Sequence, residues 1–367
     1  MLAKSIPAKK YNIKTGETLF SARNKCPELV IIPPRYTLYM QCSRGMMEIL
    51  KAYSPTVQRY SIDEAFLDYT NMEEYFGDPI QAAYTIKERI KNQLGFTVNI
   101  GIGNNKLLAK MASEFEKPDK VHTLYKNEIT KKMWPLPIEE LFFVGPATWK
   151  KLKSRGIMTI GGLANTDPDY LQKWLKSQGL LIWKYANGLD DSLVKNDGVP
   201  IKGLGNSNTV AFDVTDHETA YQILLALSET VGMRIRNAGK CAYVLSVSIK
   251  NHHLISHSHQ RKLDVPIEGT NEIYENAKVL FNEMWQGEPL RHFGIHLSSL
   301  CANDFYQLSV FATKEKENKN LDRTIDEIRL KYGCNTLIRS CFLNSNIEPL
   351  MGGVLTEEEY PMMSSIL

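Results

Sequence analysis

Cysteines are few in this sequence, and none of them has the spacing of a metal-binding pair. Six cysteines are spread over 367 residues without a Cys-x-x-Cys pattern. This argues against a zinc ribbon and a disulfide-stabilised secreted scaffold, and it suits a reducing compartment. Long apolar runs are also missing, since no stretch approaches the ~18 residues of a membrane-spanning helix. The opening residues MLAKSIPAKKYN lack the apolar core of a signal peptide. The sequence therefore predicts a cytoplasmic protein without a membrane partner.

A strong charge of one sign is absent as well. The net charge is +3 and the pI is near 8.3. Hydrophobic residues make up 43% of the chain and charged residues 23%, as in an ordinary soluble globular protein. Any binding to nucleic acid must therefore depend on local basic patches. The length allows about two to four compact domains.

The residue pattern predicts two α+β regions separated by a helical one. In residues 35–126, helices are predicted at GMMEILKAYSP, PIQAAYTIKERIKNQLG and NNKLLAKMASEFEK, the last opening on Asn residues suited to capping. Strands are predicted at VQRYSIDEAFLDYT and FTVNIGIG. Residues 127–197 are expected to be helical, and the Gly-, Asn- and Lys-rich residues 195–208 to be a linker. A β-α-β-β-α-β order follows, then a charged run, KEKENKN, and a helix at LDRTIDEIRLKYG.

An acidic pair interrupts one of the predicted strands. The stretch QRYSIDEAFLDYT, residues 58–70, contains Asp63 and Glu64. Neighbours in a regular strand point to opposite faces, so both carboxylates can serve one site only if the chain bends, as a hairpin tip at Ser61–Asp63 would allow. Enclosed carboxylates need a metal or a basic partner, and Mg²⁺ commonly bridges carboxylates and substrate phosphates. From the dipeptide alone, a solvated turn is the simpler interpretation.

The sequence motifs around this acidic pair resemble those of a known family. SIDEAFLD, followed by VNIGIGNNKLLAKMAS and KPD, resembles the palm of the Y-family (UmuC/DinB-like) translesion DNA polymerases. PAKKYNIKTGETLFSARNKCPEL is similar to the fingers of that family, and ELFFVGPATWKKLKSRGI to its thumb. The resemblance implies an α+β multidomain, right-hand polymerase. Its expected parts are partial fingers (1–34), palm (35–126), helix-hairpin-helix thumb (127–197), βαββαβ little finger (198–302) and a C-terminal tail (303–367).

The same resemblance implies an activity and its metal site. The expected reaction is template-directed addition of dNMP from dNTP to a primer 3′-hydroxyl opposite damaged DNA. Asp63 and Glu64 are expected to be catalytic and to hold two Mg²⁺ ions, which activate the attacking hydroxyl and neutralise the leaving pyrophosphate. Lys9 and Lys117 are expected to bind the triphosphate. Ile6 stands where the family has a tyrosine and cannot donate a hydrogen bond, and Lys9 replaces an arginine and so contacts phosphate as a point charge.

Contacts to primer-template DNA are expected from basic residues in three regions. A helix after GIGNN carries two lysines four residues apart, and therefore on one side. In FFVGPATWKK a Gly-Pro turn leads into a helix N-terminus that can bind phosphate. The expected contacts are Lys106, Lys110, Gly145, Lys150, Lys151, Lys153, Lys250, Arg261 and Lys262, with a solvated surface charge as the alternative for each cation. Four histidines, His252, His253, His257 and His259, are interpreted as exposed residues around a hairpin tip and not as a metal site.

The pentapeptide QLSVF, residues 307–311, resembles the sliding-clamp-binding word of bacterial polymerases. Gln307 would enter a polar pocket of the clamp, and Leu308 and Phe311 would be apolar anchors. A short edge strand is the alternative interpretation.

One motif of the family is not found in the first 34 residues. Family members carry an Asp-x-Asp-like motif and an aromatic pair on a first palm strand, which supplies a further metal ligand. Its absence predicts an exposed sheet edge and weak or no activity for this chain alone. A non-catalytic DNA- and clamp-binding remnant or accessory factor is therefore the alternative function.

Overall fold

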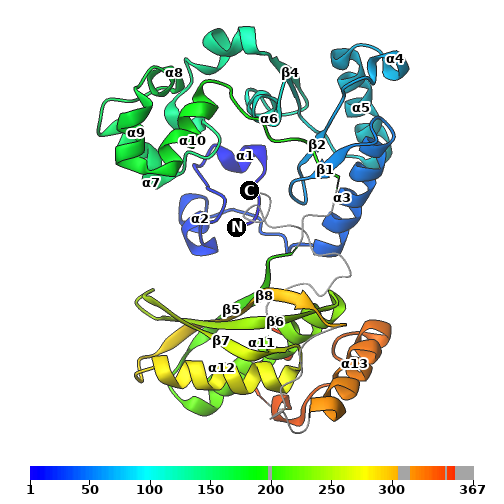
Figure 1. Cartoon of the computed structure of the whole chain (residues 1–367), viewed down its shortest axis with the longest axis vertical. Helices are drawn as coiled ribbons and strands as arrows, with labels where there is room; N and C mark the ends of the chain where they lie inside the picture. Colours follow the sequence, from blue (N-terminus) through cyan, green and yellow to red (C-terminus); the bar gives the residue numbers. More distant parts are fainter. Residues whose placement is uncertain (197–200, 305–314, 344, 352–367) are drawn as a thin grey trace. The chain divides into compact units, whose positions relative to one another are not determined.

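The structure is a computed structural model that describes residues 1–196, 201–304, 315–343 and 345–351. The chain divides into two compact units, Met1–Gly198 and Val199–Leu367, which are described one at a time (Figure 1). Among the described residues, no helix combines the length and apolar composition that a membrane crossing requires.

The first unit begins with two short helices, α1 (Ile6–Lys9) and α2 (Leu19–Lys25). The hydroxyls of Ser5 and Thr18 cap them by accepting main-chain N–H bonds. A small apolar cluster of Ala8, Ile13 and Ala22 joins the two helices, so this segment has a core of its own.

Two longer helices, α3 (Tyr36–Lys51) and α5 (Pro79–Leu94), pack together after it, with the short α4 (Glu73–Phe76) between them in sequence. Their contact is apolar and includes Met46 and Ile49 of α3 and Ile86 and Ile90 of α5. The predicted helices in this region are confirmed.

Three of the four short strands lie within the two predicted stretches, the fourth, at Val121–Leu124, was not predicted, and the four form two separate pairs. Strands β1 (Val57–Arg59) and β2 (Ala65–Leu67) are antiparallel, whereas β3 (Ile100–Gly103) and β4 (Val121–Leu124) are parallel. Within the described residues, β2 and β3 each have one hydrogen-bonded neighbour.

Helix α6 (Lys106–Glu114) connects β3 to β4 and packs closely on β3. Its predicted asparagine cap is confirmed, because the side chain of Asn105 accepts a 2.9 Å bond from Leu108 N–H. Glycine is required at 101 and 103, where an added Cβ would lie 2.0 Å from Ala109 O and 2.7 Å from Ala109 N, respectively.

The remainder of the first unit is helical. Its α-helices are α7 (Pro146–Lys153), α8 (Ile160–Ala164), α9 (Pro168–Leu175) and α10 (Ser177–Ala186), preceded by tighter or wider turns at Lys126–Glu128, Ile129–Met133 and Ile138–Glu140. One apolar cluster joins this region to α6 through Leu107 and Leu108. Residues after α10 contact β1 and α6: Val57 N–H of β1 donates to Asn196 (3.0 Å), and Leu107 N–H of α6 donates to Asp190 (3.2 Å).

The second unit is a four-stranded antiparallel sheet covered on one face by two helices (Figure 1). Its elements are β5 (Gly203–Val214), α11 (His217–Asn237), β6 (Lys240–Asn251), β7 (Ser256–Ile267), α12 (Thr270–Met284) and β8 (Leu290–Ala302), with strand order β5-β8-β6-β7. The predicted β-α-β-β-α-β order is confirmed.

The expected linker at 195–208 is partly wrong, because β5 already begins at Gly203. Gly203 and Gly205 make room for a side chain of the neighbouring strand and do not form a loop. An added Cβ at Gly203 or Gly205 would lie 2.8 Å from the ring of His296 on the neighbouring strand.

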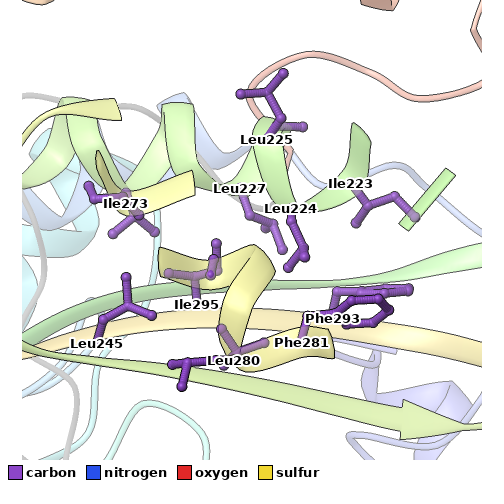
Figure 2. Packing of buried hydrophobic residues seen from close by; sticks show 14 of the residues in the cluster. Ile223, Leu224, Leu225, Leu227, Leu245, Ile273, Leu280, Phe281, Phe293 and Ile295 are labelled. Carbon is purple, nitrogen blue, oxygen red and sulfur yellow. The ribbon is translucent and has the colours of Figure 1, made fainter. Parts of the chain in front are cut away.

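The core of this unit lies between the helices and one face of the sheet. Figure 2 shows Leu224 and Leu227 of α11 gathered with Phe281 of α12 and with Phe293 and Ile295 of β8. The opposite face of the sheet carries none of these core residues.

A third helix of the second unit, α13 (Glu315–Tyr332), contacts α11, and a short turn at Ser340–Phe342 follows it. Buried ion pairs join the helices: Arg236 of α11 contacts Asp326 (2.6 Å) and Asp322 (3.3 Å) of α13. Arg329 of α13 contacts Glu229 of α11 at 3.2 Å. The helix begins at Glu315, so the run KEKENKN overlaps its first turns and was wrongly predicted to precede it.

Candidate active site and nucleic-acid interface

The acidic pair occupies a hairpin tip between β1 and β2. Main-chain N–H groups of Tyr60 and Ser61 both donate to Glu64 O, at 2.9 and 3.1 Å, and close the turn. This turn interrupts the strand alternation at the position where the sequence requires a bend. Asp63 is exposed, and its carboxylate accepts a 2.6 Å bond from the Ser61 hydroxyl.

Glu64 has two carboxylate oxygens in different situations. One of them, Oε1, forms an ion pair with Lys110 of α6. The other, Oε2, is buried without a hydrogen-bond partner in the structure. Because an unsatisfied buried acceptor costs about 1–3 kcal/mol, Oε2 is a strong acceptor for a cation or a donor that reaches the tip.

Lys110 links Glu64 to a second carboxylate and to Lys117. Its Nζ lies 3.0 Å from Glu114, and Glu114 in turn contacts Lys117 at 2.7 Å. The four side chains therefore form one alternating chain of charges, Glu64–Lys110–Glu114–Lys117. This chain connects an expected metal ligand with an expected triphosphate ligand.

The charges in this chain stabilise one another. Burial opposes the charge on Lys110, but hydrogen bonds to Glu64 and Glu114 outweigh burial and raise the pKa of the lysine. Burial likewise opposes the charge on Glu114, but hydrogen bonds from Lys117 and Lys110 lower the pKa of that carboxyl. Both shifts favour the charged forms of Lys110 and Glu114.

Lys106 and Lys110 both face the β1–β2 hairpin. Lys106 Nζ lies 3.3 Å from Gln58 Oε1 and 5.6 Å from the ring centre of Phe66. Burial, together with the neighbouring Lys195, lowers the pKa of Lys106, although Asp190 acts in the opposite direction. The side chain of Lys110 is only 13% exposed. The contacts of both lysines are thus made within the protein.

The carboxylates at the tip fit the ligand preference of magnesium. Mg²⁺ takes oxygen ligands and usually binds through one or two protein carboxylates, with waters and substrate phosphates completing its shell. Asp63 and Glu64 supply two such carboxylates, and Glu64 Oε2 has a free acceptor site. No group of three or more His, Cys, Asp or Glu side chains gathers in a metal-binding arrangement within the described part of the chain.

The expected triphosphate lysines differ in their surroundings. Lys117 is half exposed at the end of the charge chain. Lys9 is exposed at the last position of α1, and Ile6, at the first position of the same helix, is also exposed. Asp68, on the same hairpin, accepts bonds from the Thr70 N–H (3.0 Å) and hydroxyl (2.6 Å), and so stabilises the following turn.

Helix α7 carries the expected glycine at its N-terminus and the expected lysines in its last turn. Gly145 caps the helix, and an added Cβ there would meet no atom within 4 Å. Lys150 and Lys151 are exposed. Lys153 instead contacts Glu139 at 2.8 Å and lies 4.6 Å from the ring centre of Trp149.

A second group of cations and aromatic rings in this region was not predicted. Tyr170 and Trp174 of α9 stack with ring centres 5.8 Å apart. Arg155 lies over Trp174 at 4.8 Å, and Lys173 over Tyr170 at 5.6 Å. The i, i+4 spacing of the two rings was the available signal.

The open face of the second unit's sheet forms a polar surface. Antiparallel partners share a face and alternate residues lie on it, so the strand register defines its members. They are Gly203, Gly205, Ser207 and Thr209 of β5; His292, Gly294, His296 and Ser298 of β8; Val244, Ser246, Ser248 and Lys250 of β6; and Ser256, Ser258, Gln260 and Lys262 of β7. None of these sixteen described positions is acidic. We call them the open face.

The expected DNA contacts of the second unit are divided between the two faces of the sheet. Lys250 and Lys262 belong to the open face. Arg261 points to the other face, where it forms an ion pair with Glu283 of α12, and His259 contacts the same carboxylate at 3.2 Å. Arg261 is therefore already neutralised by the helix.

Two histidines of the open face were also missed. His292 Nδ1 lies 2.8 Å from the Thr209 hydroxyl. Burial lowers the pKa of His292, and Lys250 lowers it further, while burial alone lowers the pKa of His296. The β-strand period of two places them on this face, but only with the strand register known. The four histidines of the predicted hairpin tip are all exposed.

Two family models match the chain. Residues 1–114 match the impB/mucB/samB family, and residues 201–310 match the impB/mucB/samB family C-terminal domain.

Named relatives match nearly the full chain. DNA polymerase IV of Clostridium acetobutylicum is 47% identical over 344 residues, which are 94% of this chain and 87% of the relative. DNA polymerase IV 2 of Bacillus subtilis is 36% identical over 346 residues, covering 92% of this chain and 84% of the relative.

Solved structures share the fold. The Y-family DNA polymerase chimera Dbh-Dpo4(243-245)-Dbh superposes with a TM-score of 0.70 at 24% identity, covering 81% of this chain and 86% of that one. An insertion ternary complex of Dbh DNA polymerase has a TM-score of 0.55 at 24% identity, with 82% and 87% covered. The mixture of helices and sheets in this chain is thus the fold that these structures have.

Proposed function

The chain belongs to the impB/mucB/samB family of DinB-like Y-family DNA polymerases, and we propose that it is a template-directed DNA polymerase that adds nucleotides to a primer opposite damaged bases. The observation that carries the proposal is the hairpin tip with Asp63 and Glu64, joined by the charge chain to Lys117.

Asp63 and Glu64 would hold Mg²⁺ ions, which when bound lower the barrier to in-line phosphoryl transfer by neutralising charge on the attacking and leaving oxygens. The protein itself contributes position and charge. Lys110 holds Oε1 of Glu64 in an ion pair, which leaves Oε2 as the acceptor for a cation. The tip is therefore preorganised as an anionic site before substrate arrives.

Lys117 and Lys9 would attract the triphosphate. Both side chains are exposed, so their ammonium groups can reach a phosphate as point charges. Lys117 would exchange its exposed ion pair with Glu114 for the more highly charged triphosphate, at little cost because an exposed pair contributes about 0–1 kcal/mol.

Primer-template DNA would bind through the open face and through α7. Lys250, Lys262 and the serine hydroxyls of the open face can contact phosphate oxygens, and none of its sixteen positions is acidic. The α7 N-terminus at Gly145 would hold a backbone phosphate, and Lys150 and Lys151 in the last turn of the helix would add positive charge. Such contacts are independent of base sequence.

A bacterial sliding clamp would bind Gln307, Leu308 and Phe311. These residues lie outside the described part of the chain, so the proposal depends on their sequence and on their location between β8 and α13. Replacing both Leu308 and Phe311 with alanine is expected to abolish co-purification with the clamp, and unchanged co-purification would refute this part of the proposal.

A non-catalytic DNA- and clamp-binding accessory factor is the second candidate function. Glu64 favours it, because its charge is already compensated by Lys110 in the protein alone. In that case DNA would bind without any nucleotide being added.

Primer extension by the purified chain separates the two functions. The substrates are a primed template with one abasic site and the undamaged template, each with dNTPs and Mg²⁺, and DNA binding is measured in parallel. Extension past the abasic site supports the polymerase. Tight DNA binding without extension on either template supports the accessory factor instead.

A further inference from the structure

Two cysteines face each other across the sheet of the second unit, apart from the residues discussed above. Cys241 of β6 is the direct partner of Cys301 of β8 in the strand register, and their Sγ atoms are 3.2 Å apart. We propose that Cys241 and Cys301 are a site of reversible disulfide formation, with a peroxide as the oxidant.

The backbone already has the geometry that a disulfide requires. Directly opposed residues of antiparallel strands have Cα atoms about 4.5–5.5 Å apart, within the range of about 4.4–6.8 Å in which disulfides form. The two sulfurs need to approach by only about 1.2 Å to reach the S–S bond length of ~2.05 Å. Rotation of the side chains is sufficient for this.

The surrounding contacts keep the two thiols together. Pairing is continuous on both sides of them, Lys240 with Ala302 and Ala242 with Leu300. Each thiol also lies near a carbonyl of the opposite strand: Cys241 Sγ is 3.5 Å from Ala302 O, and Cys301 Sγ is 3.7 Å from Cys241 O. The sulfurs thus remain neighbours whenever the sheet is folded.

Their unequal exposure determines the order of the chemistry. Cys241 is 1% exposed, whereas Cys301 is partly exposed. The Cys301 thiolate attacks a peroxide oxygen, the O–O bond breaks, and Cys301 sulfenic acid and one hydroxide form. The Cys241 sulfur then attacks the Cys301 sulfur, the S–OH bond breaks and the S–S bond forms. Overall, two thiols and one hydrogen peroxide give one disulfide and two waters.

The bond would stabilise the second unit. It joins residues 60 positions apart, and closing a loop of this length restricts the unfolded chain substantially. It would also fix the end of β8, where Asn303 N–H donates to Gly239 O at 3.2 Å. A rise of about 5 °C in the melting temperature of the unit is expected on oxidation.

Peptide mapping of the unmodified full chain tests the proposal. The protein is treated with hydrogen peroxide, quenched in acid, unfolded in guanidinium with an alkylating reagent, and digested without reduction. The expected product is a peptide pair linked through Cys241 and Cys301, which dithiothreitol converts to two alkylated peptides. Alkylation of both residues at a peroxide dose that oxidises the exposed Cys341 would overturn the proposal.

Thermal melting with matched variants gives an independent test. Cys301→Ser is expected to abolish the peroxide-induced rise in melting temperature, and Cys341→Ser is expected to retain it. An equal rise in Cys301→Ser would contradict the assignment of the stabilising bond to this pair.

Discussion

Glu64 at the tip of the β1–β2 hairpin forms an ion pair with Lys110 of α6. The sequence around Asp63 and Glu64 predicts a bend with two carboxylates, and both carboxylates lie at the tip of the β1–β2 hairpin. The ion pair of Glu64 with Lys110 was not predictable. Helical spacing places Lys106 and Lys110 on one side, but it does not say whether that side faces solvent or the hairpin, which only the packing of α6 on the strands determines.

Replacing Lys110 with methionine is expected to lower the free energy of unfolding by about 1–2 kcal/mol at pH 7, because Glu64 and Glu114 lose their shared partner. The pKa of Glu114 is lowered in the folded protein, so its contribution is present above about pH 4.5 and is lost as the pH falls through the folded pKa. The deficit of the variant, measured by urea unfolding from pH 7 to pH 3, should therefore shrink toward pH 3.

The matched control is Lys120→Met. Lys120 is half exposed and has one 3.8 Å contact with Glu116, so its loss should change stability by no more than about 0.5 kcal/mol. Equal losses in the two variants at pH 7 would show that Lys110 does not hold the site together.

At the scale of elements, the hydrophobic periodicity of the sequence predicted the order of helices and strands better than the residues at which they begin and end. The helices α3, α5 and α6 and the six elements of the second unit follow the predicted pattern. Gly203 and Gly205 were assigned to a linker because glycine usually marks a loop, whereas here it makes room for the His296 ring within β5. Long-range contacts of this kind cannot be inferred from local sequence.

The packing of α6 on β3 predicts a large effect of one methyl group. Gly101→Ala would place Cβ 2.0 Å from Ala109 O and 2.4 Å from Ser113 N, and it is expected to cost about 3 kcal/mol or more in chemical denaturation. Gly145→Ala is the control, since open space surrounds that position. Similar stabilities for the two variants would mean that α6 and β3 are not in close contact.

The attachment of α13 to α11 predicts another strong effect. Arg236 is 5% exposed and contacts both Asp322 and Asp326. Arg236→Met would leave two buried carboxylates unpaired and is expected to destabilise the unit by about 3–5 kcal/mol, with faster amide hydrogen exchange in α13.

Arg323→Met is the control for this effect. Arg323 is exposed and contacts Glu268 at 3.8 Å, so a loss below about 1 kcal/mol is expected. Unchanged exchange in α13 of Arg236→Met would show that the ion pairs do not hold the helix in place.

At the scale of the whole molecule, local distribution of charge matters more than net charge. With a net charge of only +3, the proposed DNA binding would depend on surfaces such as the open face, whose sixteen positions include lysines and histidines but no carboxylate. The sequence predicts Lys250, Arg261 and Lys262 as DNA contacts. The sequence alone could not show that Lys250 and Lys262 lie on one face of the sheet and Arg261 on the other, because the face of each side chain depends on the strand register.

DNA binding at several salt concentrations tests this separation. The double variant Lys250→Gln/Lys262→Gln is expected to bind duplex DNA more weakly and to reduce the slope of log K against log salt by about 0.9 for each phosphate that the protein no longer neutralises. Arg261→Gln is the control and should change the slope little, since Glu283 already neutralises Arg261. A larger effect for Arg261 would contradict the assignment of the open face to DNA.

The assignment of a polymerase site to the β1–β2 hairpin is tested most directly by the rate of single-nucleotide incorporation in Mg²⁺. Glu64→Gln keeps the shape of the side chain but removes its charge, and it should lower the rate by about 100-fold or more. Glu116→Gln changes an exposed carboxylate just after α6, the helix that carries Lys110, and should leave the rate within about twofold. An unchanged rate for Glu64→Gln would contradict the site assignment.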